Sequence, residues 1–358
     1  MSAGERPILV TGGAGFIGCN IADRLLREGH DVIVYDALAR AGVERNVAWL
    51  QDRHGDKVEL IVADVRDAAT LGAAARRAGA VFHMAAQVAV TTSLADPRED
   101  FDINIGGTFN LLEAVRQTGA PVPVIFASTN KVYGDLIDLD FDATDQGYLP
   151  ADAELRAHGI SEARPLDFHT PYGCSKGAAD QYVLDYARSF GVPAAVLRMS
   201  CIYGERQMGT EDQGWVAHFL IRALEGQTIT LYGDGHQVRD ILQVSDAVDA
   251  YMATWRRINT VAGRAFNLGG GPGNAVSLRT LLDHIGTLVG TAPDVRFDDW
   301  RAGDQRYFVA DTRAAQSALE LGATVPWREG VARLAQWLAA ERGLPIGAER
   351  VAMPAAAL

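Results

Sequence analysis

The stretch "TGGAGFIG" (11–18) is the part of the sequence that decides the fold. Gly12, Gly15 and Gly18 are spaced by three, and "GAGFIG" (13–18) also satisfies the pattern G-x-G-x-x-G. The apolar run "ILVT" (8–11) precedes these glycines, and the amphipathic segment "NIADRLLREG" (20–29) follows them. Glycines here allow a tight turn and let backbone amides approach a pyrophosphate at a helix N-terminus. The motif alone is weak, but this strand–turn–helix context predicts a dinucleotide-binding unit.

Short apolar runs alternate with segments of helical period through the first 200 residues. The predicted strands are "ILVT" (8–11), "DVIVYD" (31–36), "VELIVA" (58–63), "AVFHMA" (80–85), "VPVIFAS" (122–128) and "AAVLRMS" (194–200). Between them lie segments such as 101–118 and 179–190, which carry apolar residues at helical spacing. Continuous apolar strands separated by helices predict an α/β fold, a Rossmann-type doubly wound parallel sheet covered on both faces.

The pattern becomes irregular after about residue 200, where Gly-rich turns such as "YGDGHQ" (232–237) and "NLGGGPG" (267–273) appear. We therefore predict a dinucleotide-binding domain over 1–200, to which later segments at about 236–270 return. A smaller mixed α/β lobe over 201–340 is expected to cover the carboxyl edge of the sheet and bind the substrate. The tail 345–358 is expected to be flexible.

Asp36 ends the second predicted strand and indicates which dinucleotide binds. A carboxylate at this point accepts hydrogen bonds from the adenosine ribose diol and repels a 2′-phosphate, so NAD is favoured over NADP. Arg40 could instead serve a 2′-phosphate, or it could stack on the adenine.

Two further strand ends are candidates for the cofactor site. Asp64, followed by Val65, is placed to meet the adenine rim, or it is the N-cap of the helix that follows. The two roles are compatible. Ala85 and Ala86 are small enough to let the chain pass beneath a cofactor, although tight packing alone would also explain them.

Tyr172 and Lys176, in "PYGCSKGAAD" (171–180), stand four residues apart just after a proline. On a helix both side chains share one face, since each residue turns the helix by about 100°. A tyrosine with an ordinary pKa near 10 is a poor base at neutral pH, but a neighbouring ammonium and an oxidised nicotinamide stabilise its phenolate. The phenolate can then take a proton from an alcohol, with Thr129 or Ser128 as hydroxyl donor at the end of the fifth strand. The alternative, a solvated helix face, would suit an arbitrary helix better than this one.

The motifs "TGGAGFIG", "FASTNKVYGD" (126–135) and "PYGCSKGAADQYVLDYA" (171–187) together resemble the extended short-chain dehydrogenase/reductases, the family of nucleotide-sugar epimerases and dehydratases. The resemblance extends from about residue 6 to residue 340. It implies that Thr129, Tyr172 and Lys176 are catalytic, and that Asn104 orients the lysine through water. It also implies a tightly bound NAD, whose predicted contacts are Gly12, Gly15, Phe16, Ile17, Gly18, Asp36, Arg40, Asp64, Val65, Ala85, Ala86, Gln87, Asn104, Ser128, Tyr172, Lys176 and Met199.

The neighbours of Thr129 discriminate between the reactions of this family. A 4,6-dehydratase typically has an Asp–Glu pair directly after the catalytic threonine, whereas this chain has Asn130 and Lys131. An amide or an ammonium does not replace a carboxyl acid/base at neutral pH, so dehydration is disfavoured. We expect epimerisation: transient oxidation, rotation of the keto-sugar, and hydride return with NAD retained. The residues leave open whether carbon 2 or carbon 4 reacts, and the resemblance favours carbon 2 of a CDP-hexose. A 4-epimerase of a UDP- or GDP-linked hexose is the alternative, ahead of a 4,6-dehydratase, a reductase or a non-catalytic dinucleotide sensor.

A nucleoside diphosphate needs cations, and Arg239 and Arg306 in the irregular lobe are the candidates, unless they merely pair with Asp240 and Asp304. Gln213 lies in "EDQGWVAHF" (211–219), which begins a helix expected to cap the sugar or phosphates. Cys201 either faces the sugar or is a small buried apolar residue. The full predicted substrate site is Val88, Thr91, Ser93, Thr129, Asn130, Cys201, Gln207, Gln213, Val216, Tyr232, Arg239 and Arg306.

The composition excludes several other classes of partner. The 358 residues carry a formal net charge of −12, which argues against nucleic acid or an anionic membrane. The three cysteines have neither metal-ligand spacing nor a secretory context, so we expect no disulfide framework and no metal site. Without a long apolar run or a signal peptide, a cytoplasmic protein is expected. The resemblance implies a homodimer or homotetramer, paired through the helices at 101–118 and 175–190.

Overall fold

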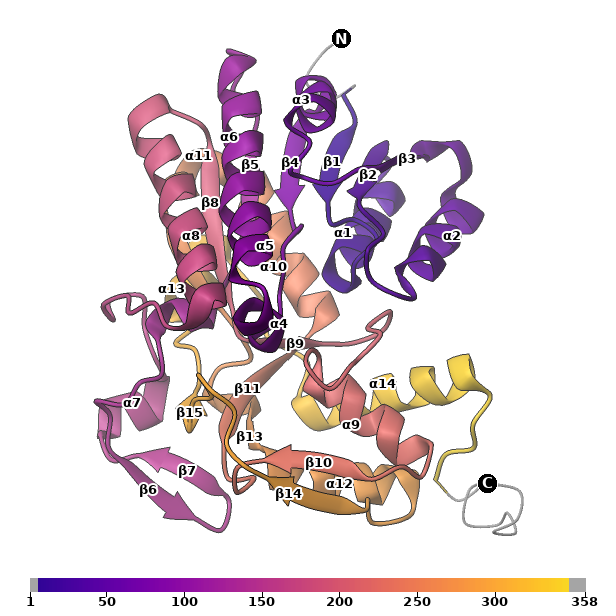
Figure 1. Cartoon of the computed structure of the whole chain (residues 1–358), viewed down its shortest axis with the longest axis vertical. Coiled ribbons are helices and arrows are strands. Elements are labelled where there is room, and N and C mark those ends of the chain that lie inside the picture. The colour runs from indigo at the N-terminus through magenta and orange to yellow at the C-terminus, as the bar shows by residue number, and fades with distance from the viewer. Residues whose placement is uncertain (1–5, 348–358) are drawn as a thin grey trace.

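The computed structural model describes residues 6–347. Figure 1 shows a large sheet with its helices in the upper half and a smaller lobe below it. The sheet has seven strands in the order β12-β8-β5-β4-β1-β2-β3, and every neighbouring pair is parallel. Its strands are β1 (Ile8–Thr11), β2 (Val32–Asp36), β3 (Val58–Val62), β4 (Ala80–His83), β5 (Val124–Thr129), β8 (Ala194–Met199) and β12 (Ala265–Leu268).

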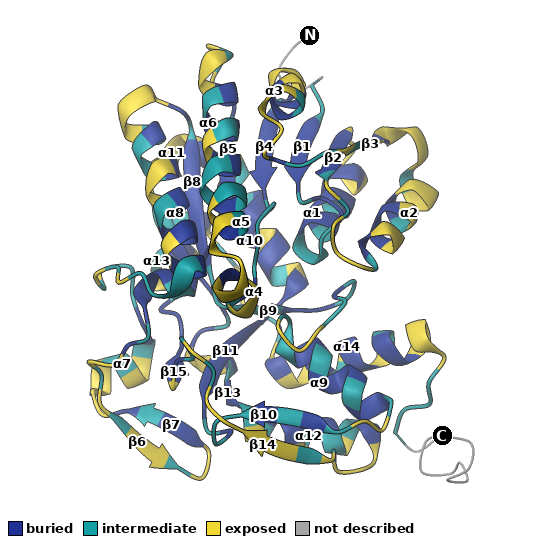
Figure 2. Ribbon diagram, viewed as in Figure 1, coloured by how far each residue is buried: buried dark blue, intermediate teal, exposed yellow. Residues whose placement is uncertain are grey.

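Alternate residues of these strands enter two separate cores, one on each face of the sheet. Ile8 and Val10 of β1 pack with one helical layer, whereas Leu9 between them packs with the other. The first layer consists of α1 (Phe16–Arg27), α2 (Val43–His54), α10 (Val244–Arg256), α11 (Ile258–Val261) and α13 (Arg313–Leu319). The second consists of α3 (Ala68–Arg77), α6 (Thr108–Gln117) and α8 (Thr170–Phe190). Figure 2 shows the central strands buried and the exposed residues on the outer sides of these helices. The predicted Rossmann-type fold is confirmed.

The smaller lobe has its own core, formed mainly by three helices against short strands. Its helices are α9 (Trp215–Leu224), α12 (Leu278–Val289) and α14 (Trp327–Arg342). One of its sheets joins β9 (Cys201–Tyr203), β11 (Val238–Gln243), β13 (Ala275–Ser277) and β15 (Tyr307–Phe308), and another pairs β10 (Ile229–Tyr232) with β14 (Val295–Asp298). The helices α4 (Val90–Ala95) and α5 (Pro97–Phe101) pack against α8, whereas the hairpin of β6 (Phe141–Thr144) and β7 (Gly147–Pro150) packs against the strands of the smaller lobe and is followed by α7 (Ala153–His158) (Figure 1).

The chain passes between the two lobes more than once. Residues 244–268 return to the large sheet through α10 and β12, and α13 also packs there. The return therefore begins at α10 rather than at about residue 236, because β11 pairs with β9, β13 and β15 of the smaller lobe. An apolar strand followed by a helix has the same sequence pattern in either sheet, so the pattern does not distinguish them.

Two further predictions concern the C-terminal tail and membrane-spanning segments. The segment 348–358 of the predicted tail lies outside the described residues. Among residues 6–347, no helix combines the length and the apolar character that crossing a bilayer requires.

Candidate active site

A cavity of about 900 Å³ runs along the carboxyl edge of the large sheet and continues between the two lobes. One end is lined by the Gly-rich turn after β1, the middle by Thr129, Tyr172 and Lys176, and the far end by residues of α9 and β10. This is the edge at which open α/β sheets bind their ligands. The cavity therefore brings the predicted cofactor and substrate residues to one place.

The Gly-rich turn is shaped by close backbone contacts. Gly12 has a φ of 66°, and a Cβ there would lie 2.7 Å from the amide nitrogen of Ala85. A Cβ on Gly18 would lie 2.1 Å from the carbonyl oxygen of Gly12, so the helix and the turn touch without side chains between them. Within residues 6–347, no side chain caps α1 at Gly15. Its first amides are thus directed at the cavity and suit the oxygens of a pyrophosphate.

Asp36 lines the cavity beside this turn. Its Oδ2 accepts a hydrogen bond from the amide of Ala14 at 3.0 Å, and its Oδ1 accepts one from the amide of Leu38 at 2.9 Å. Burial raises the pKa of this carboxyl, while the hydrogen bonds and the charge of Arg40 oppose the rise. The residues present therefore fit NAD: free amides for the pyrophosphate and a carboxylate for the ribose diol.

Replacing Asp36 with alanine should weaken NAD binding by about 10- to 100-fold, because a hydrogen bond to a charged group contributes about 1.5–3 kcal/mol. Calorimetric titration of cofactor-stripped protein with NAD measures the change. Asp31→Ala is the matched control, since Asp31 is exposed just before the other end of the same strand. Equal dissociation constants for the two variants would contradict the assignment of Asp36.

Asp64 does not cap the helix that follows it. Its carboxylate pairs with Arg66 at 2.7 Å, and this hydrogen bond lowers its pKa. The N-cap of α3 is Asp67, whose Oδ1 accepts hydrogen bonds from the amides of Ala69 and Thr70 at 3.1 Å. Asp64 does line the cavity, as does Val65, so their expected place near a cofactor is compatible with the structure.

The catalytic candidates come from two elements that converge at the sheet edge. Thr129 is the last residue of β5, and Tyr172 and Lys176 project from the first turns of α8. The helix begins at Thr170 with Pro171 in its first turn, where the missing amide hydrogen costs nothing. The Thr129 hydroxyl lies close enough to the phenol of Tyr172 to favour its ionised form. Lys176 Nζ donates to the carbonyl oxygen of Ala127 at 2.6 Å.

Burial dominates the electrostatics of this pair. It raises the pKa of Tyr172 to about 12, against the opposing influence of the Thr129 hydroxyl and the Arg40 charge. It also lowers the pKa of Lys176 to about 7, against the charges of Asp180 and Asp100. In the protein alone, desolvation of the phenol therefore outweighs the Arg40 charge. The stabilisation of the phenolate by an oxidised nicotinamide stays a prediction.

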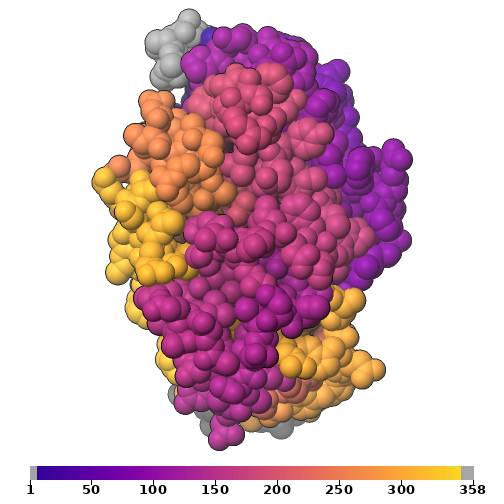
Figure 3. Space-filling model, turned by 90° about the vertical axis from the view of Figure 1, so that its left-hand side faces the viewer, coloured from indigo at the N-terminus to yellow at the C-terminus, as the bar shows by residue number. Residues whose placement is uncertain are grey.

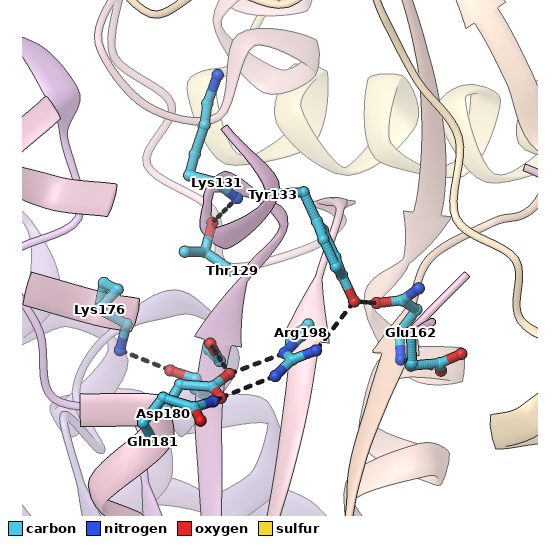
Figure 4. Close-up of polar contacts among 11 residues, drawn as sticks. Thr129, Lys131, Tyr133, Glu162, Lys176, Asp180, Gln181 and Arg198 are labelled. Atoms are coloured by element: carbon cyan, nitrogen blue, oxygen red, sulfur yellow. Dashed lines mark hydrogen bonds and ion pairs between the residues drawn. The ribbon is translucent and has the colours of Figure 1, made fainter. Parts of the chain in front are cut away.

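A buried polar network lies directly beneath the site, and Figure 4 shows its members. Asp180 of α8 accepts two hydrogen bonds from Arg198, Nε to Oδ2 at 2.9 Å and Nη2 to Oδ1 at 3.0 Å. Ser128 Oγ also donates to Asp180 Oδ2, at 2.8 Å. Arg198 Nη1 donates to the hydroxyl of Tyr133 at 3.1 Å. The Ser128 hydroxyl is therefore committed to Asp180. Thr129 Oγ1 donates a long hydrogen bond to Asn130 Oδ1 at 3.4 Å, which a substrate oxygen can replace.

Asn104 is buried behind the catalytic helix, in a π-helical turn over Asp102–Gly107. Its Nδ2 donates to Ser175 Oγ at 3.0 Å and to Asp100 Oδ1 at 3.1 Å, and its Oδ1 accepts from the amide of Gln87 at 2.9 Å. The direct contact of Asn104 with α8 is thus through Ser175, the residue before Lys176.

Most of the residues predicted to contact the cofactor or the substrate line the cavity, and five of them do not. Ala85, Ala86, Met199, Val88, Thr91, Asn130, Cys201, Gln207, Gln213, Tyr232 and Arg239 line it. Gln87 and Asn104 lie behind the wall, where they form a hydrogen bond with each other. Val216 lies in the core of the smaller lobe. Ser93 is buried, and its Oγ accepts a hydrogen bond from the amide of Tyr172 at 3.2 Å. Arg306 is exposed, with its guanidinium 5.4 Å from the ring centre of Tyr148.

Sequence reasoning missed four cations of the cavity, namely Arg66, Lys131, Arg206 and Arg301. Arg301 lines it in place of Arg306, with its guanidinium 3.7 Å from the ring centre of Tyr232. Both arginines belong to the stretch "RAGDQRYF", and only packing shows which one turns inward. Lys131 also lines the cavity and donates from Nζ to the carbonyl oxygen of Gly303 at 2.8 Å. Arg239 is held at the wall by Asp304, at 2.6 Å.

The sheet, the Gly-rich turn and the Thr–Tyr–Lys trio define a class of NAD-dependent enzymes, and comparison with known proteins agrees. The model of the NAD dependent epimerase/dehydratase family matches residues 8–269, and the chain belongs to this family. CDP-paratose 2-epimerase of Salmonella typhi is 41% identical over 339 residues, which cover 92% of this chain and 98% of that protein. The sequence-based assignment to the family of nucleotide-sugar epimerases and dehydratases is confirmed.

Solved structures of 4-epimerases share the whole architecture. UDP-glucose 4-epimerase of Thermotoga maritima, solved with UDP-glucose, has a TM-score of 0.81 at 28% identity over 94% of this chain and 99% of that one. UDP-glucose 4-epimerase of Thermus thermophilus, solved with NAD, has a TM-score of 0.78 at 32% identity over 93% and 98%. The similarity covers both lobes.

Proposed function

We propose that this enzyme inverts carbon 2 of a CDP-linked hexose, using an NAD that stays tightly bound between turnovers. The observation that supports this most is the convergence of Thr129, Tyr172 and Lys176 in one cavity with two arginines at its far end. The similarity to CDP-paratose 2-epimerase supports the choice of base and carbon.

In the proposed reaction, Tyr172 takes the proton of the sugar hydroxyl while the hydrogen on the same carbon leaves as hydride. The acceptor and later donor of that hydride would be the NAD held at the Gly-rich turn and Asp36. Thr129 donates a hydrogen bond to the reacting oxygen and holds it near the phenol oxygen of Tyr172. After the keto-sugar rotates, Tyr172 gives the proton back, so the protein and its cofactor end as they began. Lys176 supplies the positive charge that favours the phenolate.

The two residues after Thr129 support epimerisation over dehydration. Asn130 Nδ2 donates to Gln305 Oε1 at 3.3 Å, and Lys131 Nζ donates to the carbonyl oxygen of Gly303. Both side chains tie the end of β5 to the loop at 303–305. The positions that carry an acidic pair in 4,6-dehydratases are here occupied by hydrogen-bond donors engaged with that loop, and neither can act as a carboxyl acid/base.

Arg239 and Arg301 are the proposed ligands of the diphosphate. Arg239 is buried and fixed by Asp304. Arg301 donates to the carbonyl oxygen of Glu211 at 3.2 Å and pairs with the carboxylates of Glu211 at 3.2 Å and Asp212 at 3.6 Å, and a diphosphate would have to replace these contacts. A guanidinium suits phosphate oxygens because it presents several donors in one plane. The nucleoside would then lie beyond the arginines, between α9 and β10.

The function is tested by offering CDP-, UDP-, GDP- and dTDP-hexoses to the holoenzyme in normal and deuterated buffer. We expect NMR to show inversion at carbon 2 of a CDP-sugar, without deuterium from solvent, because the hydride returns from the cofactor. Denatured protein should release NAD. Cofactor-free protein that consumes external NADPH stoichiometrically would instead identify a reductase.

A 4-epimerase is the second candidate, favoured by the similarity of both lobes to UDP-glucose 4-epimerases. The same panel separates the two, since the inverted carbon and the accepted base are read directly from the product. Inversion at carbon 4 of a UDP-sugar, with no turnover of CDP-sugars, would replace the 2-epimerase proposal.

We also propose that two copies pair through α6 and α8. Phe109 of α6 and Tyr182 of α8 are 43% and 45% exposed, with ring centres 6.1 Å apart, so they form an apolar patch on the outside of the molecule. Figure 3 shows that the middle of the chain, coloured purple to pink, makes up most of one face. Light scattering should give the mass of a dimer, or of a tetramer built from two dimers. A stable monomer would remove this proposal.

A further inference from the structure

Asp100 is a buried acid behind the catalytic pair, and the reaction proposed above does not use it. It lies in α5, it is 1% exposed, and its Oδ1 accepts a hydrogen bond from Asn104 Nδ2 at 3.1 Å. Its Oδ2 makes no hydrogen bond within 3.5 Å among residues 6–347. Burial raises the pKa of this carboxyl, against the nearby Ser175 hydroxyl and the Lys176 charge, which favour the carboxylate. A buried carboxylate oxygen without a partner is costly, so its presence needs a reason.

Asp100 reaches the catalytic helix through one relay. The same Nδ2 of Asn104 donates to Ser175 Oγ at 3.0 Å, and Ser175 stands between Tyr172 and Lys176 in the sequence. The α5 helix packs against α8. The carboxylate is therefore held behind the segment that carries both catalytic side chains.

Other ionisable groups also face the pair. Asp180 faces Lys176 but is paired with Arg198. Arg40 faces Tyr172 from the segment after β2. His83 of β4 faces Lys176 but stays neutral, since burial lowers its pKa to about 3. Asp100 acts on both Tyr172 and Lys176, and in the described part of the chain it forms no ion pair of its own.

We propose that the Asp100 carboxylate acts through Tyr172 and Lys176 to set the pH range in which this pair is active. The proposal rests on the acid–base role given to these two residues above. A negative charge makes each of them harder to deprotonate, and it accordingly raises the pKa of both. Proton transfer needs Tyr172 as phenolate and Lys176 as ammonium. Asp100 thus moves the acid limb and the alkaline limb of the activity profile together, toward higher pH.

Asp100→Asn removes the charge and keeps the shape, so it tests this directly. In the holoenzyme both limbs of the kcat profile should move to lower pH by about half a unit to one unit, as expected for one charge at an intermediate effective dielectric. Asp102→Asn is the matched control, since Asp102 lies two residues on and pairs with Arg98 at 2.7 Å in contact with solvent. The control should leave both limbs in place.

A purely structural role would lower kcat without moving the limbs, and that result would overturn the proposal. If Asp100→Asn does not fold, Asp100→Ser serves instead, because it also removes the charge and retains a hydroxyl for Asn104. The ionisation of Tyr172, followed as the ultraviolet difference between the holoenzyme and its Tyr172→Phe variant, gives a readout without substrate. This readout therefore remains valid even if the epimerase assay fails. An unchanged pKa of Tyr172 in Asp100→Asn would refute the proposal about Asp100.

Discussion

Replacing Tyr172 with phenylalanine is expected to lower kcat by about two to four orders of magnitude while NAD stays bound. The phenol is the group placed to move the hydroxyl proton: it is buried, lines the cavity and lies near the Thr129 hydroxyl. A positioned acid–base group contributes about 10²- to 10⁴-fold to a rate. Phenylalanine keeps the ring and its packing, so the cofactor site should not change. Single-turnover and steady-state epimerisation, with NAD content measured after denaturation, check both parts.

Tyr186→Phe is the matched control for this experiment. Tyr186 lies on the same helix, and its hydroxyl donates to Glu113 Oε1 at 2.7 Å, far along α8 from the cavity. We expect its removal to leave kcat within about twofold. A Tyr172→Phe variant that retained comparable turnover would show that another group moves the proton, and the proposed mechanism would be abandoned.

Much of the fold was predictable because parallel strands are apolar throughout. The six predicted strands correspond to β1, β2, β3, β4, β5 and β8, with ends that differ by up to two residues. The seventh, β12 (Ala265–Leu268), precedes a glycine cluster and pairs with β8, which lies about 70 residues earlier. Such a pairing depends on packing between distant segments, and no local periodicity encodes it.

In the site, local motifs predicted which segments meet at the cavity, but they did not predict the direction in which each side chain points. The four-residue spacing of Tyr172 and Lys176 puts both on one helical face, and the structure has them lining one cavity. Neighbouring residues of one type were harder to separate. Ser128 turns to Asp180 while Thr129 faces Tyr172, and Arg301 turns inward while Arg306 faces solvent. In each pair, long-range partners decide which side chain reaches the site.

The network beneath the site leads to the second large effect, on stability. Asp180 is 0% exposed and Arg198 is 5% exposed, so neither charge has water to replace its partner. Replacing Asp180 with alanine leaves the Arg198 guanidinium, which cannot lose its proton, without its ion-pair partner. It also removes the acceptor of the hydrogen bond from the Ser128 hydroxyl. Breaking a buried ion pair from one side costs about 3–5 kcal/mol. The free energy of unfolding, measured with urea on the holoenzyme, should fall by this amount.

Asp185→Ala is the control on the same helix. Asp185 pairs with Arg188 at the surface, and its side chain and that of Arg188 are 43% and 80% exposed. An exposed pair of this kind contributes about 0–1 kcal/mol, so the control should remain close to the parent protein. Equal losses for Asp180→Ala and Asp185→Ala would mean that water reaches Arg198 after all.

A double variant separates the cost of the uncompensated charge from the cost of lost packing. Asp180→Leu combined with Arg198→Met removes both charges and keeps apolar volume, and replacing a buried pair in this way is often neutral. We expect the double variant to unfold at a higher urea concentration than Asp180→Leu alone, because the unpaired guanidinium is gone. The hydroxyl of Tyr133 still donates to Asn267 Oδ1 at 2.7 Å and so keeps one partner. If the double variant is as unstable as the single one, the penalty comes from packing between β5, β8 and α8, and the ion pair contributes little.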